Sequence, residues 1–144
     1  MTQWNIFKVG DIISINNILG FFVVNQKIKS LNEYINACRR NKYAGAKMKA
    51  DTEKVIEFEI QNALSKGTLK PVKKPCKVKF EFHEKTAKRD VDNISGFGHK
   101  TILDAMQNKG IIINDNQRYI TGLIDEFIRD EKDFIGVKRE NPRF

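Results

Sequence analysis

The sequence contains few of the residues that cross-link or break a fold, with two cysteines and three prolines among 144 residues. Cys38 and Cys76 form no CxxC pair and have no histidine at ligand spacing, so neither a disulfide framework nor structural zinc is expected. No apolar run approaches the ~18 residues of a membrane span. The N-terminus lacks the features of a secretory signal, so we expect a reduced, cytoplasmic protein.

Acidic residues are scarce in two segments of this basic chain, whose formal net charge is +8. Residues 26–49 carry seven Lys and Arg against one acid, and residues 66–89 carry nine against two. Residues 111–144 are nearly neutral. Two basic segments predict a surface that faces a phosphate backbone. A charged surface that only keeps the protein soluble would give the same counts.

Hydrophobic periodicity predicts a single α+β domain with a mixed sheet and two main helices. Helices are expected over 52–64, after an Asp51-Thr52 cap, and over 99–108, with a glycine-containing loop at 94–98. Residues 1–20 suggest short strands in an amino-terminal extension, followed by one domain over 21–144. Strands of that domain are expected over 21–24, 78–82, 111–113, 119–128 and 134–138.

Three carboxylates follow apolar runs and indicate a metal site. If the chain is extended at Asp90 and Asp92, these side chains point the same way, with Cα atoms roughly 6–7 Å apart. Asp115 follows the apolar run 111–113. Carboxylate oxygens bind Mg²⁺, and surrounding basic residues bind nucleic acid, so this combination is typical of a metal-dependent phosphodiester nuclease.

Other interpretations of these residues were weighed. Asp90, Asp92 and Asn93 would also suit a turn. A calcium-binding EF-hand is excluded, because its obligatory glycine position holds Ser95 and its bidentate glutamate position holds Thr101. Lys100 lies four residues before Asp104, as in an ordinary helical surface pair. It could instead lie near the metal and stabilise charge on a scissile phosphate.

These motifs resemble the RusA family of Holliday junction resolvases, over roughly residues 21–138. The resemblance rests on Arg89-Asp90-Val91-Asp92-Asn93, then Lys100, Asp104-Ala105, and the run from Gly110 to Asp115. Asn114-Asp115 stands where the better-known pattern has two consecutive acids.

The resemblance implies a RusA-like homodimer that binds four-way DNA junctions in recombination and repair, and cuts opposed strands symmetrically with Mg²⁺ or Mn²⁺. It implies that Asp90, Asp92 and Asp115 bind the metal and act in catalysis, with Lys100 as an essential base. A non-catalytic structure-specific DNA-binding protein, or a nuclease for flaps or forks, remains an alternative. The candidate phosphate contacts are Arg39, Arg40, Lys47, Lys49, Lys73, Lys74, Lys88 and Arg89.

Overall fold

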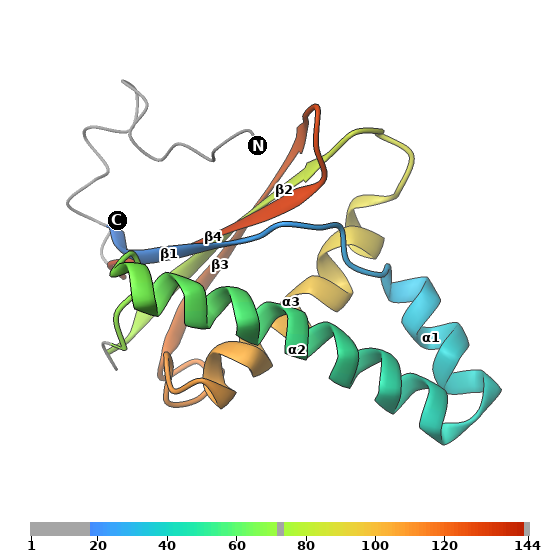
Figure 1. The fold of residues 1–144 in the computed structure, drawn as a ribbon, viewed down its shortest axis with the longest axis horizontal. Coiled ribbons are helices and arrows are strands. Elements are labelled where there is room, and N and C mark those ends of the chain that lie inside the picture. The colour runs from blue at the N-terminus through green and yellow to red at the C-terminus, as the bar shows by residue number, and fades with distance from the viewer. Residues whose placement is uncertain (1–17, 72–73, 143–144) are drawn as a thin grey trace.

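A four-stranded mixed sheet packs against helices in this computed structural model, which describes residues 18–71 and 74–142 (Figure 1). The strand order is β1-β4-β2-β3, with β4 antiparallel to both neighbours and β2 parallel to β3. The core lies where Phe80 and Phe82 of β2 meet Ile60 of α2 and Phe97 of α3. The elements are β1 (Ile18–Val24), α1 (Leu31–Arg40), α2 (Lys42–Lys66), β2 (Cys76–Glu84), α3 (Val91–Asn108), β3 (Ile120–Arg129) and β4 (Phe134–Glu140).

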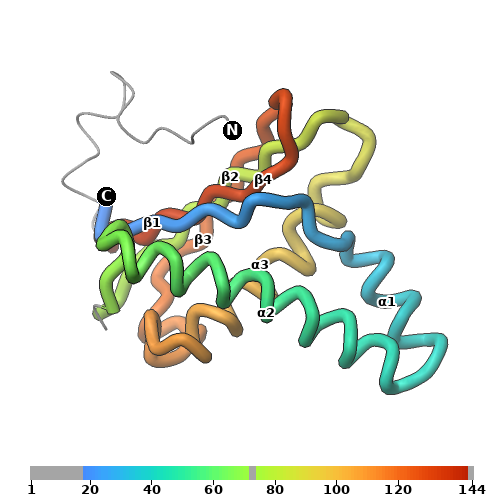
Figure 2. Tube along the Cα trace, in the orientation of Figure 1, coloured from blue at the N-terminus to red at the C-terminus, as the bar shows by residue number. Residues whose placement is uncertain are grey.

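Helix α3 connects the two parallel strands, so it runs back along the sheet between them (Figure 2). The segment after α3 meets the beginning of β2, where the Cys76 N–H donates to the Tyr119 carbonyl at 3.0 Å. The segment before α3 meets the end of β2, where Arg89 pairs with Glu84. The two ends of α3 therefore mark opposite ends of the sheet.

The predicted loop over 94–98 is wrong, because α3 begins at Val91 rather than at His99. Two glycines in its first half allow close packing instead of breaking the helix. A Cβ at Gly98 would lie 2.9 Å from Phe82 Cε1, and one at Gly96 would lie 2.8 Å from Leu31 Cδ2. Tertiary contact thus overrides the low helix propensity of glycine.

The prediction of two main helices is also wrong, since the described residues contain three. Helix α2 begins at Lys42, because the Asn41 side chain accepts hydrogen bonds from the N–H groups of Tyr43 and Ala44. The expected cap at Asp51-Thr52 therefore lies inside α2. The helix was expected to end at Leu64 and ends two residues later, at Lys66, where Gly67 takes the left-handed conformation at φ 79°.

Four of the five predicted strands are confirmed, with ends that differ by at most three residues. The strand expected over 111–113 is wrong. The N–H groups of Ile111 and Ile112 donate to the Met106 carbonyl, so this segment closes the end of α3. Of the expected extension, residues 1–17 lie outside the described residues, and residues 18–20 belong to β1.

Candidate active site

The turn that carries Asp90 is held in place by Arg89. The Arg89 guanidinium pairs with the Glu84 carboxylate at the end of β2, and Nη1 donates to the Ile28 carbonyl at 3.1 Å. The Arg89 and Glu84 side chains are only 17% and 9% exposed. Because a planar guanidinium fixes two partners at once, Asp90 stands on a rigid turn.

Asn93 attaches the same turn to α1. Its Oδ1 accepts a hydrogen bond from the Asn32 N–H at 3.3 Å. Helix α1 begins there with a capping box, in which Ser30 and Glu33 bond to each other's backbone. The Ser30 N–H, 3.0 Å from the Glu33 carboxylate, lowers the pKa of Glu33. Residues 28–33 and 89–93 therefore form one interlocked unit.

Asp90 and Asp92 lie at the beginning of α3. Asp90 is the N-cap, with extended backbone at φ −66° and ψ 146°, but its side chain makes no capping hydrogen bond. Asp92 lies in the first helical turn, so the prediction of two carboxylates on one face of an extended chain is wrong. Both side chains are exposed, and neither has a hydrogen bond or ion pair within the described part of the chain. Two carboxylates therefore stand available at one helix N-terminus.

Asp115 lies at the opposite end of α3. Asp92 and Met106 are about 21 Å apart along the helix, at 1.5 Å per residue. Ile112 is bonded to the Met106 carbonyl, and three further residues reach at most about 10 Å. The chain also turns away, since the Ile120 N–H donates to the Asn116 carbonyl at 2.9 Å where β3 begins. Within one chain, Asp115 therefore lies too far from Asp90 and Asp92 to join them in one site.

The donor set suits a hard cation. Mg²⁺ is usually held by one or two carboxylates, while water and substrate phosphates complete its coordination. Asp90 and Asp92 match that pattern as a pair of exposed oxygen donors. Among the described residues no group of three or more His, Cys, Asp or Glu is close enough to hold a metal by itself. A complete three-carboxylate site needs a ligand from elsewhere.

Lys100 and Asp104 do not pair with each other as a helical surface pair would. Asp104 accepts from Lys49 of α2 at 2.8 Å, and Lys49 also pairs with Glu53. Burial opposes the charge on Lys49, but these two carboxylates outweigh it and raise the lysine's pKa. Lys100 is exposed and lies about 12 Å along α3 from Asp92, at 1.5 Å per residue. Lys49 and Asp104 thus join two helices.

The other predicted phosphate contacts differ in their surroundings. Arg39 and Arg40 lie exposed in the last turn of α1, and Lys88 is exposed two residues before Asp90. Lys47 is exposed and pairs with Asp51 at 2.8 Å. Lys74 is exposed, whereas Lys73 lies outside the described residues. Helix α1 and the beginning of α3 lie at the same end of the molecule (Figure 1).

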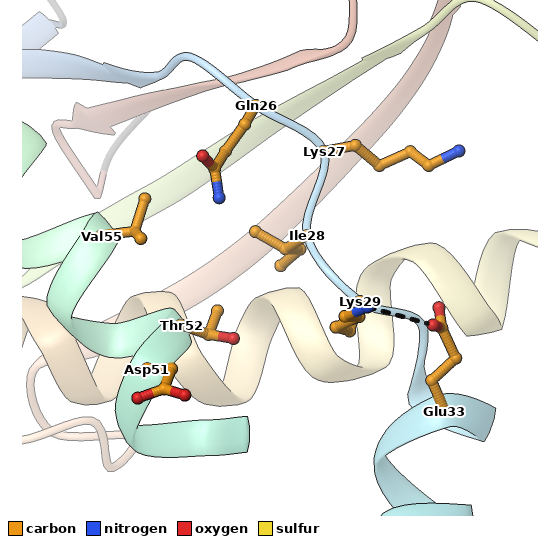
Figure 3. Close-up of a pocket in the computed structure, with 8 residues that line it drawn as sticks. All are labelled: Gln26, Lys27, Ile28, Lys29, Glu33, Asp51, Thr52 and Val55. Carbon is orange, nitrogen blue, oxygen red and sulfur yellow. Dashed lines mark ion pairs between the residues drawn. The ribbon is translucent and has the colours of Figure 1, made fainter. Parts of the chain in front are cut away.

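Two hollows lie near this end. One, of about 320 Å³, opens between residues 26–29 and α2. Figure 3 shows Thr52 and Val55 beside it, Lys27 pointing away, and the Lys29–Glu33 ion pair at its rim. The other, of about 240 Å³, is lined by Val91, Phe127 and Arg129 among others, next to Asp90. The second hollow is the one that adjoins the carboxylate pair.

Comparison with protein-family models gives a match. A family model, Endodeoxyribonuclease RusA, matches residues 14–138 and so covers most of the chain. No curated protein matches the sequence. Among the described residues, no helix is both long and apolar enough to cross a membrane.

Proposed function

Because the chain belongs to the RusA family of endodeoxyribonucleases, we propose that it resolves four-way DNA junctions by paired, symmetric, Mg²⁺- or Mn²⁺-dependent nicks. The observation that carries this proposal is the pair Asp90 and Asp92, which is exposed at a helix N-terminus beside basic side chains. The Arg89–Glu84 ion pair holds the turn that carries Asp90. A non-catalytic DNA-binding protein has no use for two carboxylates that face a phosphate backbone, since they repel it.

The position of Asp115 supports a homodimer as the active form. Asp115 belongs to the family motif but lies at the far end of α3 from Asp90 and Asp92. A second chain, related by a two-fold axis, can supply the missing carboxylate to each site. Each site then takes Asp90 and Asp92 from one chain and Asp115 from the other. Two equivalent sites account for two symmetric nicks in a two-fold junction.

In this proposal each group of the chain has a defined task. Asp90, Asp92 and Asp115 hold the cation, which when bound supplies charge neutralisation at the scissile phosphate. Arg89 and Asn93 keep the two carboxylates of the turn in position. Lys100 is the essential base in this proposal, and its positive charge faces the bound DNA strand.

Basic residues near the turn hold the DNA backbone. Arg39 and Arg40 lie about 12 Å along α1 from its beginning, which Asn93 fixes to the active-site turn. Phosphates on one strand follow each other at about 3.4 Å along the duplex axis. The arginines of α1 and Lys88 can therefore contact phosphates a few nucleotides from the cut. Lys49 and Arg89 serve structural roles instead, because carboxylates already pair with both.

The proposal is tested with a labelled synthetic four-way junction, incubated with Mg²⁺ or with EDTA. We expect wild-type protein to make paired nicks only with Mg²⁺. Asp92→Asn should reduce cleavage at least about 100-fold, because a charged ligand at the reacting phosphate is lost. The same variant should bind the junction as well or better, since a negative charge facing DNA has been removed.

Asp51→Asn on α2 is the matched control, because Asp51 is also exposed but pairs with Lys47. It should cut at the wild-type rate. Normal cleavage by Asp92→Asn would show that the active-site assignment is wrong. Tight binding without any cut by the wild-type protein would favour a regulatory DNA-binding protein. Cleavage of flaps or forks alone would mean that the substrate is another kind of branched DNA.

A further inference from the structure

Hydrogen bonds hold open the hollow between residues 26–29 and α2, which we call the 26–29 pocket. Just before this segment, the Asn25 side-chain amide donates to the Glu59 carboxylate of α2 at 3.1 Å. Near its other end, the Ile28 carbonyl accepts from Arg89 at 3.1 Å. The segment is therefore fixed on both sides of the pocket, whose volume is about 320 Å³. Sites for small ligands are usually preformed and begin at about 300 Å³, so this pocket has room for one compact group.

The lining of the 26–29 pocket combines apolar and polar side chains. Ile28 is buried and Val55 is half-buried, and both offer apolar surface. The Gln26 side chain points from its segment toward α2 (Figure 3), and its amide has no hydrogen-bond partner among the residues that the structure describes. The Thr52 hydroxyl donates to the Met48 carbonyl at 2.8 Å, which leaves its oxygen able to accept. The pocket thus offers hydrogen-bond donors and acceptors beside apolar side chains.

The charge at the rim of the 26–29 pocket is positive. Lys29 pairs with Glu33 at 3.7 Å. The other acid at the rim, Asp51, pairs with Lys47 at 2.8 Å. Lys27 is exposed and points away from the pocket (Figure 3), with no ion pair in the described part of the chain. Because a lysine balances each acid, Lys27 leaves a surplus of positive charge that attracts an anionic group to the rim.

The 26–29 pocket shares a wall with the active-site turn. Arg89, which binds the Ile28 carbonyl, directly precedes Asp90. Asn93 of the same turn accepts from the Asn32 N–H at 3.3 Å, beside the rim of the pocket. A DNA strand bound at this turn therefore passes the pocket within a few nucleotides.

We propose that the 26–29 pocket binds one unstacked base of the DNA strand, a few nucleotides from the bond that is cut. A nucleotide has the same three parts as the pocket, namely apolar ring faces, a polar base edge and an anionic phosphate. The ring faces lie against Ile28 and Val55, the edge meets Gln26 and Thr52, and the phosphate stays with the lysines of the rim. This base site rests on the proposed function and adds to it a contact that the carboxylates do not make.

A base reaches such a pocket only after it leaves the stack. In a continuous duplex each base is stacked on both sides, so its extrusion is unfavourable. At a branch point the stack is interrupted, and extrusion there costs less. The base site therefore favours branched DNA over a linear duplex.

Fluorescence tests the base site on the wild-type protein. 2-Aminopurine is an adenine analogue whose emission is quenched while it is stacked. It is placed in a four-way junction at each of the three nucleotides on either side of the branch point in one strand, and EDTA prevents cleavage. We expect a several-fold rise in emission at one of these positions when protein is added. The same analogue in the middle of a duplex arm is the control and should stay quenched.

A variant that fills the pocket tests where the base goes. Val55→Trp places an indole ring in the pocket. It should abolish the rise in emission and lower kcat/KM for junction cleavage at least about 10-fold, as the loss of a base contact does. Ser65→Trp is the matched control, because Ser65 is exposed on the same helix about 15 Å further along, and it should keep the wild-type emission and rate. Circular dichroism checks that both variants are folded.

The outcomes separate the base site from the enzyme. A rise that Val55→Trp abolishes, with no cutting by the wild-type protein, supports the base site and contradicts the proposed function. Metal-dependent cutting without any rise contradicts the base site alone, and this result does not depend on whether Val55→Trp folds. An equal rise with folded Val55→Trp would show that the base leaves the stack without entering the 26–29 pocket, which would also overturn the base site.

Discussion

Neighbouring basic residues can have separate tasks, as Lys88 and Arg89 show. Both were predicted to contact phosphates because they form a basic pair before Asp90. Lys88 is exposed, but Arg89 is 17% exposed and bonded to Glu84 and to the Ile28 carbonyl. The guanidinium can bind several partners in one plane, so it can join the three segments that meet at this turn. Its charge is therefore paired within the turn.

Replacing Arg89 should therefore destabilise the fold. We expect Arg89→Met to lower the free energy of unfolding by about 2 kcal/mol, because the largely buried Glu84 carboxylate loses its partner. Lys88→Met should change it by less than about 0.5 kcal/mol, as is usual for exposed residues. Urea denaturation measures both values. Equal stability of the two variants would mean that the Arg89–Glu84 ion pair contributes nothing to the stability of the fold.

Among the elements, those with a regular apolar pattern were predictable. Residues 78–82 of β2 alternate because one face of that strand packs in the core, and the strand was expected there. Helix α1 was missed although the sequence carries its signals, since Ser30 and Glu33 have capping-box spacing and apolar residues recur at helical spacing from Leu31 to Cys38. The first half of α3 was missed because Gly96 and Gly98 suit a loop locally. These positions are glycine because a Cβ there would come too close to Leu31 and Phe82, which are distant in sequence.

The packing of α3 gives a prediction with a definite sign. Gly→Ala in an open helix is stabilising by about 1 kcal/mol. Gly98→Ala should instead be destabilising by about 1–3 kcal/mol, because the new methyl would meet the buried Phe82 ring at 2.9 Å. Ser95→Ala is the helical control on the same element. Thermal unfolding compares the two, and a stabilised Gly98→Ala would show that Phe82 moves aside freely.

For the whole molecule, the sequence gives candidate site residues, whereas their arrangement in space depends on the fold. The residue types at Asp90, Asp92 and Asp115 were recognisable from their spacing and from the family motif. Their separation depends on the true length of α3, and that length was hidden by the glycines in its first half. With α3 beginning at Val91, the helix holds the two parts of the motif apart instead of joining them.

A site shared between two chains makes a prediction about mixed dimers. Asp92→Asn and Asp115→Asn should each be inactive alone. Refolded together, about half of the dimers are mixed, and each mixed dimer has one site with all three carboxylates and one with neither Asp92 nor Asp115. The mixture should therefore recover single nicks on a labelled junction. A mixture as inactive as either variant would contradict sites shared between chains.

Strand β4 lies in the interior of the sheet, although it is the last strand in chain order. Its neighbours are β2 and β1, and Glu140 is in register with Ile18 at the far end of the chain. During synthesis, β1 has to wait without a strand partner until residues 134–140 leave the ribosome. Contacts between such distant residues form slowly. A chain that ends before residue 134 therefore lacks the strand that joins β1 to β2.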